Sequence, residues 1–284
     1  MAYLDHIAAC NAHDIDRFLP FFADRRHVGW VRDDHAPYLA AHPDIFRLTG
    51  DTVSLHPRLT TPAMRTQAVA QALTALAPGL GLPAPRGEWY AAGPGWNEPS
   101  LFSLDRAYAS LFGIRAFGIH VNGIVRRPDG LFLWIGRRAM DRPVAPGQLD
   151  NMIAGGQPAG LGLIENLVKE AAEEAAVPEA LARTARPVGA ITYCLEDEWG
   201  LKPDTMFCFD LELSEDFIPR NTDGEITGFE LMPVDEAAAR VRTGNDFKFN
   251  VNLVLLDFLI RHGCLTPDEE PDYIAIVRGL RRGW

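Results

Sequence analysis

The chain has 284 residues, of which 47% are hydrophobic and 23% are charged, and it carries a formal net charge of -11. No apolar run reaches the roughly 20 residues that a membrane-spanning helix needs, and the acidic charge disfavours nucleic acid as a partner. The first residues also lack a basic segment followed by an apolar one, so we expect no secretory signal and a cytoplasmic protein.

In the first third of the chain, short amphipathic segments alternate with proline-bearing turns. Thr61 followed by proline predicts the start of a helix that reaches about Ala77. Glycines and prolines then crowd residues 77–100, which indicates that the helix ends and a connector follows. A chain of this length is long enough for two domains. We expect a smaller α+β accessory domain over residues 1–111 and an α/β domain over residues 112–284.

The clearest β pattern follows the connector. Residues 117–125 and 131–138 are rich in β-branched and aromatic residues, and they flank a segment in which Pro128 and Gly130 suit a type I turn. These two segments predict a hairpin. Beyond it we expect a short strand over 149–156 that runs into two glycines, two strands within 191–213, and helices over about 162–176, 233–241 and 249–262.

The helix expected over residues 162–176 carries three carboxylates on one face. Glu170, Glu173 and Glu174 are spaced i, i+3 and i+4, which places them within an arc of roughly 100°. Like charges this close are unfavourable without a cation, and Mg²⁺ prefers oxygen ligands. A helix whose glutamates simply face water is the alternative. We expect the acidic edge to point outward and the opposite side to press on a sheet, through Ile164, Val168, Ala171, Ala172 and Ala175.

The stretch from Gly155 to Val177 resembles a Nudix box, whose pattern is Gly-x5-Glu-x7-Arg-Glu-U-x-Glu-Glu-x-Gly-U with U apolar. The leading glycine and the three helix carboxylates are in register. The departures are Leu161 for the first glutamate, Lys169 for the arginine and Ala176 for the last glycine. We expect Lys169 to hold Glu173, with Glu165 partly replacing the missing glutamate. With Ala176 in place of the last glycine, we expect the helix to end at this alanine and the chain to turn at the next residue.

The resemblance to this family implies a fold and a chemistry. Nudix enzymes bind Mg²⁺ or Mn²⁺ through the box glutamates and hydrolyse a diphosphate linked to a group X. A hairpin, the box, two strands and a closing helix follow one another in the order of a Nudix αβα sandwich, a mixed sheet flanked by helices. The resemblance therefore implies this sandwich, preceded by the smaller α+β domain.

A narrower resemblance rests on the box helix "ENLVKEAAEEA" and on four other segments, residues 117–125, 134–156, 223–236 and 247–263. Together they look like the Nudix proteins related to thiamine pyrophosphokinase, which carry an extra N-terminal domain. Members of that subgroup are associated with hydrolysis of thiamine diphosphate analogues, particularly oxidised forms, to the monophosphates. This resemblance implies the same substrate class here.

Several polar residues near these segments are candidates for the site. The resemblance to Nudix enzymes implies that Glu225, in a loop, can bind metal or act as a base on water, with a solvated loop acid as the alternative. His120 and Asn122 alternate onto one face of their strand, where they can line the pocket or belong to the core. Of the adjacent Arg137 and Arg138, only one can point inward, and we favour Arg137 as a donor to the diphosphate.

Further candidates adjoin the box. Asp150, with Gly155 and Gly156, can shape the box loop or contact substrate. The aromatic residues of the connector can stack on a cationic ring, although core packing is the expected role for them, namely Trp89, Tyr90 and Trp96.

The two resemblances together imply an enzyme that hydrolyses thiamine diphosphate, or an oxidised analogue, to the monophosphate and phosphate with Mg²⁺ or Mn²⁺. Glu173 and Glu174 are the predicted metal ligands and Glu170 is a ligand or the base, with Glu225 as the further catalytic carboxylate. Two alternative functions remain. One is a nucleoside diphosphate-X pyrophosphatase. The other is a non-catalytic sensor, which is favoured by the presence of Leu161 where the box has a glutamate. The predicted partner is a small diphosphate, and a homodimer is possible.

Overall fold

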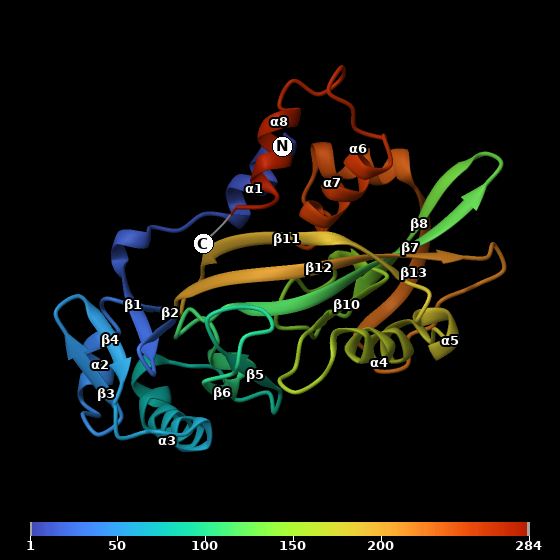
Figure 1. Cartoon of the computed structure of the whole chain (residues 1–284). Helices are drawn as coiled ribbons and strands as arrows, with labels where there is room; N and C mark the ends of the chain where they lie inside the picture. Colours follow the sequence, from blue (N-terminus) through green and yellow to red (C-terminus); the bar gives the residue numbers. More distant parts are fainter. Residues whose placement is uncertain (1, 283–284) are drawn as a thin grey trace.

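The computed structural model describes residues 2–282, which form a larger and a smaller body lying side by side (Figure 1). The larger body confirms the predicted α/β sandwich, because a mixed sheet lies between two layers of helices. The smaller body comes from the first third of the chain and has its own sheets and its own core.

The sheet of the larger body has the strand order β11-β12-β7-β8-β13, with β10 paired to β7 and β9 paired to β8. Strands β7 and β12 run parallel, and the other pairs within this sheet are antiparallel. Its central strand β7 is buried on both faces, so its apolar pattern is nearly continuous. The strands are β7 (Ala116–Arg127), β8 (Gly130–Arg138), β9 (Leu149–Asn151), β10 (Ile153–Gly156), β11 (Arg186–Glu196), β12 (Leu201–Leu213) and β13 (Ile226–Pro233).

Helices cover both faces of this sheet (Figure 1). On one face, α4 (Leu163–Ala175) and α5 (Glu179–Ala182) share a core with residues of β7 and β12. The other face is covered by helices whose residues join a second core with strands β8 and β11, and these are α1 (Tyr3–Cys10), α6 (Val234–Thr243), α7 (Val251–Arg261) and α8 (Tyr273–Gly279).

The smaller body contains a four-stranded sheet of order β2-β1-β4-β3 and a separate hairpin, β5–β6. In the four-stranded sheet, β1 and β4 are parallel. These elements confirm α+β character for this part of the chain. The strands are β1 (Phe18–Ala23), β2 (Arg26–Arg32), β3 (Phe46–Thr49), β4 (Thr52–Leu55), β5 (Trp89–Ala92) and β6 (Phe102–Asp105), and the helical segments are η1 (Ile15–Arg17), α2 (Ala36–Ala40), α3 (Pro62–Leu80) and η2 (Arg106–Tyr108).

Helix α3 begins where the sequence predicts. The Thr61 hydroxyl accepts a hydrogen bond of 3.2 Å from the Met64 amide and caps the helix. The predicted end near Ala77 is three residues too early, because Pro78 is tolerated in the last turn and the helix ends at the left-handed Gly81.

The predicted boundary at residue 111 stays a prediction, but α1 belongs with the larger body. Tyr3, Ile7 and Cys10 are buried in the core that α7 and α8 share, although they lie within the predicted accessory domain. The core of the smaller body extends to Ile114. Among residues 2–282, no helix combines the length and the apolar character that crossing a membrane requires.

Candidate active site

Helix α4 places Glu170 and Glu174 against the protein, whereas the Glu173 side chain is 47% exposed. The helix buries Leu167, Ala171 and Ala175, and Glu174 is only 5% exposed. The expected orientation is therefore wrong in part, because Ile164 is exposed together with Ala172, another of the residues expected to face the sheet. Ala171 is buried and the adjacent Ala172 is exposed, so the alanines of α4 do not by themselves indicate which face packs.

The Glu174 carboxylate lies beneath strand β10. Its Oε2 accepts a hydrogen bond of 2.7 Å from the backbone N–H of Ala154. Burial raises the pKa of Glu174 well above its usual value, and the nearby charge of Glu170 raises it further, while the bond from Ala154 works in the opposite direction. The site thus holds a buried carboxylate that lacks an ion-pair partner among residues 2–282.

Lys169 joins the other two carboxylates of the helix. Its ammonium lies 2.8 Å from Glu173 Oε2 and 3.0 Å from Glu170 Oε1. Burial lowers the pKa of Lys169, but the hydrogen bonds to Glu173 and Glu170 outweigh it and raise the pKa overall. The prediction that Lys169 holds Glu173 is confirmed, whereas its second partner is Glu170 and not Glu165.

The donor set of α4 suits a hard divalent cation, although its oxygens are not gathered around one point. Within residues 2–282, no group of three His, Cys, Asp or Glu side chains is close enough together to hold a metal ion. The Lys169 ammonium is, however, a cation held between two of the predicted ligands, and Glu174 offers a buried carboxyl group that has no ion-pair partner among residues 2–282. Glu170, Glu173 and Glu174 are thus the residues that would hold Mg²⁺ or Mn²⁺.

The two box glycines leave room for the residues around them. A Cβ on Gly155 would collide with the Glu170 carboxylate, and a Cβ on Gly156 would collide with the Tyr90 hydroxyl and lie 3.1 Å from Glu88 Oε1. The Ala159 amide also donates a 2.7 Å hydrogen bond to the Trp89 carbonyl. The β5–β6 hairpin of the smaller body therefore rests directly on the box loop.

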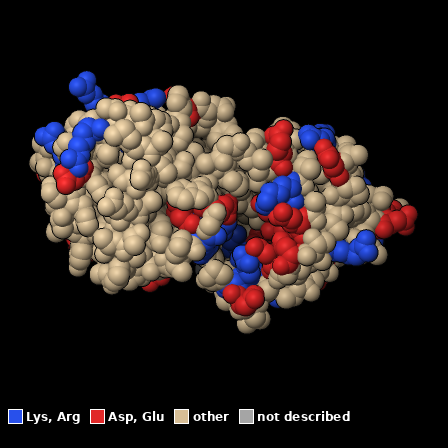
Figure 2. All heavy atoms as spheres, turned by 90° about the horizontal axis from the view of Figure 1, so that it is seen from below, with Lys and Arg blue, Asp and Glu red and all other residues tan. Residues whose placement is uncertain are grey.

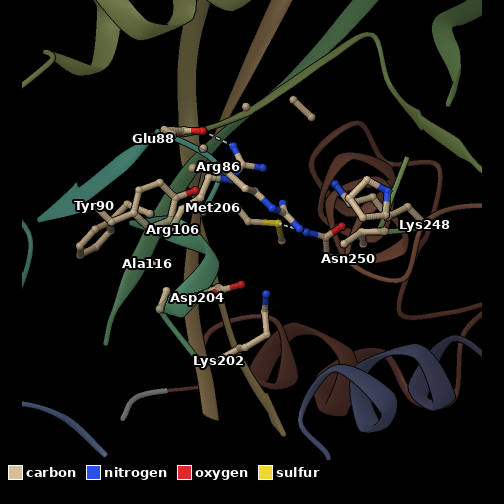
Figure 3. A pocket seen from close by; sticks show the side chains of 18 of the residues that line it. Arg86, Glu88, Tyr90, Arg106, Ala116, Lys202, Asp204, Met206, Lys248 and Asn250 are labelled. Atoms are coloured by element: carbon tan, nitrogen blue, oxygen red, sulfur yellow. Dashed lines mark hydrogen bonds and ion pairs between the residues drawn. The ribbon is translucent and has the colours of Figure 1, made fainter. Parts of the chain in front are cut away.

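A cavity of about 360 Å³ opens where the two bodies meet. Figure 2 shows the hollow, with acidic side chains on its rims and basic ones at its floor. The predicted site residues that line it are His120, Gly155, Gly156, Glu170, Glu173, Glu174 and Glu225. In Figure 3, one side of the cavity is formed by Lys248 and Asn250. The opposite side is formed by four residues of the smaller body, namely Arg86, Glu88, Tyr90 and Arg106.

Asn122 and Asp150 support the cavity from behind its wall, since neither lines it. Asn122 Nδ2 donates to Asp210 Oδ1 at 2.9 Å, and Asn122 Oδ1 accepts from Asn151 Nδ2 at 2.9 Å. A carboxylate only accepts, so Asp210 fixes the direction of this chain of bonds. At its far end, Nδ1 of His120 lies 2.8 Å from Asn151 Oδ1 and carries the proton.

His120 is uncharged at neutral pH. Burial lowers its pKa to about 4, and the charge of Lys248 acts in the same direction. The ring can therefore orient a ligand in the cavity without repelling a cation there.

The choice between the two adjacent arginines is corrected. Arg137 does not line the cavity, and its guanidinium donates to the Gly147 carbonyl at 3.0 Å. Arg138 lines the cavity and donates to Asp150 Oδ2 at 2.7 Å. Glu225 lies in the loop before β13, where its carboxylate pairs with Arg142 at 2.8 Å.

The connector residues have mixed roles. Tyr90 lines the cavity, whereas Trp96 packs on the Phe117 and Phe207 rings with centroid distances of 5.0 and 4.6 Å. The residues that sequence reasoning missed are Arg86, Glu88, Arg106 and Lys248. They lie far from the box in sequence and follow no spacing pattern that could have indicated them.

Nearly the whole chain is similar to two proteins of Arabidopsis thaliana. It is 40% identical to "Nudix hydrolase 24, chloroplastic" over 285 residues, which cover 99% of this chain and 78% of the relative. It is 39% identical to "Nudix hydrolase 20, chloroplastic" over 290 residues, which cover 98% and 77%. This chain belongs to the Nudix hydrolase family. As a Nudix hydrolase it is an enzyme that cleaves diphosphates, and enzymes of this family generally use divalent metals such as Mg²⁺ or Mn²⁺.

Two other comparisons cover parts of the Nudix hydrolase described here. A family model described as a domain of unknown function (DUF4743) matches residues 2–116, which include the smaller body. Among solved structures, the NUDIX domain of Shewanella oneidensis NrtR complexed with ADP ribose aligns with a TM-score of 0.41 and 12% identity, over 53% of this chain and 90% of that one.

Proposed function

We propose that this Nudix hydrolase uses Mg²⁺ or Mn²⁺ to hydrolyse thiamine diphosphate, or an oxidised analogue of it, to the monophosphate and phosphate. The observation that carries the proposal is that the box carboxylates Glu170 and Glu174, the loop carboxylate Glu225 and the basic side chain Arg138 line a single cavity. A diphosphate placed there meets both acidic groups for metal and water and cationic donors for its phosphate oxygens.

The residues of the cavity suit attack by water on a phosphorus atom. Water supplies the new P–O bond, the bridging P–O bond breaks, and the bridging oxygen leaves with one phosphate. Burial raises the pKa of Glu170 above its usual value, which brings this carboxylate closer to the working range of a general base for the water's proton. Glu225 is the second candidate for that proton. A bound divalent cation supplies neutralisation of the charge on the phosphoryl oxygens.

The far end of the cavity supports a heterocycle that carries N–H donors. Asn250 lines this end, and its Nδ2 lies 3.3 Å from the Tyr193 hydroxyl. Its Oδ1 is buried and has no hydrogen-bond partner among the described residues. The Tyr193 hydroxyl donates to Asp204 Oδ2 at 2.9 Å. An unpaired buried acceptor favours a ligand that brings a donor, and the aminopyrimidine ring of thiamine diphosphate does so.

An assay of released phosphate tests the substrate. Purified protein with Mg²⁺ is offered thiamine diphosphate, oxothiamine diphosphate and a set of nucleoside diphosphate conjugates, with Glu174→Gln as the inactive control. We expect a thiamine compound to give the highest kcat/KM. Preference for a nucleoside diphosphate conjugate by tenfold or more would replace thiamine with the alternative substrate class.

Assembly and location remain proposals of the same kind. We infer a homodimer from the frequency of two-fold pairs among oligomers, and light scattering of the purified chain tests it. We also keep the cytoplasm as the expected location, and a fluorescent fusion tests it against the plastid that the names of the Arabidopsis relatives give for those proteins.

A further inference from the structure

Most basic side chains in the cavity already have an ion-pair partner. Arg106 pairs with Glu88, Arg138 and Lys248 pair with Asp150, Arg142 pairs with Glu225, and Lys169 pairs with Glu170 and Glu173. Within residues 2–282, two cations that line the cavity have no such partner, namely Arg86 and Lys202. Lys202 shares a strand face with Asp204 two residues away (Figure 3).

Arg86 is held in place by its backbone. The buried carboxylate of Asp105 accepts hydrogen bonds from the amides of Arg86 at 3.0 Å and of Gly87 at 2.7 Å. The same carboxylate accepts a 2.9 Å bond from Ala107 and so caps η2, which carries Arg106. The buried Asp105 carboxylate therefore fixes the backbone at Arg86 and near Arg106, and the Arg86 guanidinium forms no ion pair within residues 2–282.

Arg86 lies in a group of three arginines. Burial lowers its pKa, and the positive charges of Arg106 and Arg142 lower it further, while Tyr90 and Asp105 act in the opposite direction without reversing the shift. The group comes from three separate segments, and Glu88 and Glu225 neutralise two of its members. Arg86 is the member of the group that has no ion pair among residues 2–282, and it lines the cavity beside the hairpin that rests on Gly156.

We propose that Arg86 forms an anion subsite, supplied by the smaller body, that binds phosphate oxygens of the diphosphate substrate. The guanidinium offers a planar fork of donors that matches a phosphate group. The subsite gives the segment matched by the domain of unknown function a specific task, which is to complete the active site of the Nudix domain. It rests on the proposed function in that both require a diphosphate in this cavity.

Two measurements on the full chain test the subsite. The first is steady-state kinetics, with Mg²⁺ and whichever diphosphate the wild type hydrolyses, for Arg86→Gln and Arg86→Lys. The second is calorimetric binding of inorganic pyrophosphate in metal-free buffer. Arg47→Gln is the matched control, because Arg47 is an exposed arginine of the same body that does not line the cavity.

We expect Arg86→Gln to raise KM by about tenfold with kcat nearly unchanged, because the lost contact serves ground state and transition state alike. Pyrophosphate affinity should fall by a similar factor, Arg86→Lys should recover part of both losses, and Arg47→Gln should match the wild type. Thermal unfolding confirms that each variant is folded. Pyrophosphate binding that is absent from the wild type, or equal in Arg86→Gln, overturns the subsite. If pyrophosphate binding depends on Arg86 but thiamine diphosphate is not hydrolysed, only the proposed substrate fails.

Discussion

The backbone N–H of Ala154 donates a 2.7 Å hydrogen bond to the buried Oε2 of Glu174, and no ion pair within residues 2–282 compensates that carboxylate. Burial keeps the folded-state pKa of Glu174 well above the unfolded-state value of about 4.3. The folded protein therefore binds a proton that the unfolded chain has already released. The free energy of unfolding falls as pH rises between these two pKa values, and the full penalty is present above the higher one.

Glu174→Gln should remove this penalty and, under the proposed function, most of the activity as well. We expect the unfolding free energy of the variant, measured with urea in EDTA, to vary less between about pH 4.5 and 7.5 than that of the wild type. Turnover should fall by about 10³-fold. Glu173→Gln is the control for stability, because the Glu173 side chain is 47% exposed. Equal pH dependence in Glu174→Gln and the wild type would contradict the prediction.

Leu161→Glu restores the box pattern, yet we expect no gain from it. Leu161 lines a second, smaller cavity beside Trp96 and Gln157 and does not line the cavity that holds Glu170. The new carboxylate would therefore not join the α4 ligands. Turnover measured against Mg²⁺ concentration should give a half-saturation point within about twofold of the wild type. A tenfold lower half-saturation point would show that position 161 reaches the metal.

Arg138 and Arg137 should respond differently to the same substitution. Arg138 is 10% exposed and pairs with Asp150, which is 1% exposed, so Arg138→Gln leaves a buried charge with Lys248 at 3.4 Å. We expect a loss of about 3 kcal/mol in the free energy of unfolding, against less than about 1 kcal/mol for Arg137→Gln. Urea denaturation of the two variants measures this difference, and equal losses would refute it.

The contribution of the Arg138–Asp150 pair to the free energy of unfolding depends on pH with the opposite sign to that of Glu174. Burial raises the pKa of Asp150, but Lys248, His120 and Arg138 outweigh it and lower the pKa overall. Its contribution to stability is therefore complete above the unfolded-state pKa of about 3.9 and is lost as pH falls through the folded-state value. When the free energy of unfolding is measured as pH is lowered, Arg138→Gln should lose less of it than the wild type does.

Ala176 ends α4 in a left-handed conformation, with φ 51° and ψ 35°. The sequence predicts the turn at the next residue, Val177, and this is wrong, because the turn lies at Ala176 itself. Glycine adopts this conformation without the steric cost that alanine bears, so Ala176→Gly should stabilise the protein by about 1 kcal/mol. Ala172→Gly, at an exposed position inside the same helix, should destabilise it by about 1 kcal/mol. Thermal unfolding of both variants tests the opposite signs.

Gly156→Ala should disturb the contact between the two bodies, because the added methyl group meets the Tyr90 hydroxyl. We expect a loss of about 1–3 kcal/mol in unfolding free energy and reduced kcat/KM. Gly228→Ala is the control, since nothing lies within 4 Å of its Cβ position. If Gly156→Ala lowers the unfolding free energy no more than Gly228→Ala does, the β5–β6 hairpin can move aside without cost.

Local patterns predicted much of the larger body. The turn at Pro128 and Gly130 indicated the β7–β8 hairpin, and the spacing of Glu170, Glu173 and Glu174 indicated the box helix. Such patterns cannot show which side of an alanine-rich helix meets a sheet, so the burial of Glu174 was not anticipated. Nor could they decide whether Arg137 or Arg138 faces the cavity, because adjacent strand residues alternate and the register sets which one points inward.

The contribution of the smaller body was beyond sequence reasoning for a different reason. Arg86 and Glu88 reach the cavity through a contact between segments some seventy residues or more apart in sequence, and only the packing of the hairpin on Gly156 creates it. The connector pattern indicated turns in that region and gave no sign of a shared wall.

The hairpin against Gly156 also separates two tasks. In the proposed reaction, bond cleavage depends on α4 and its loop, whereas much of the opposite wall is supplied by a body with its own core. Changes in that wall can therefore alter which molecule is admitted while the carboxylates keep their positions, so selectivity and reactivity are open to independent adjustment.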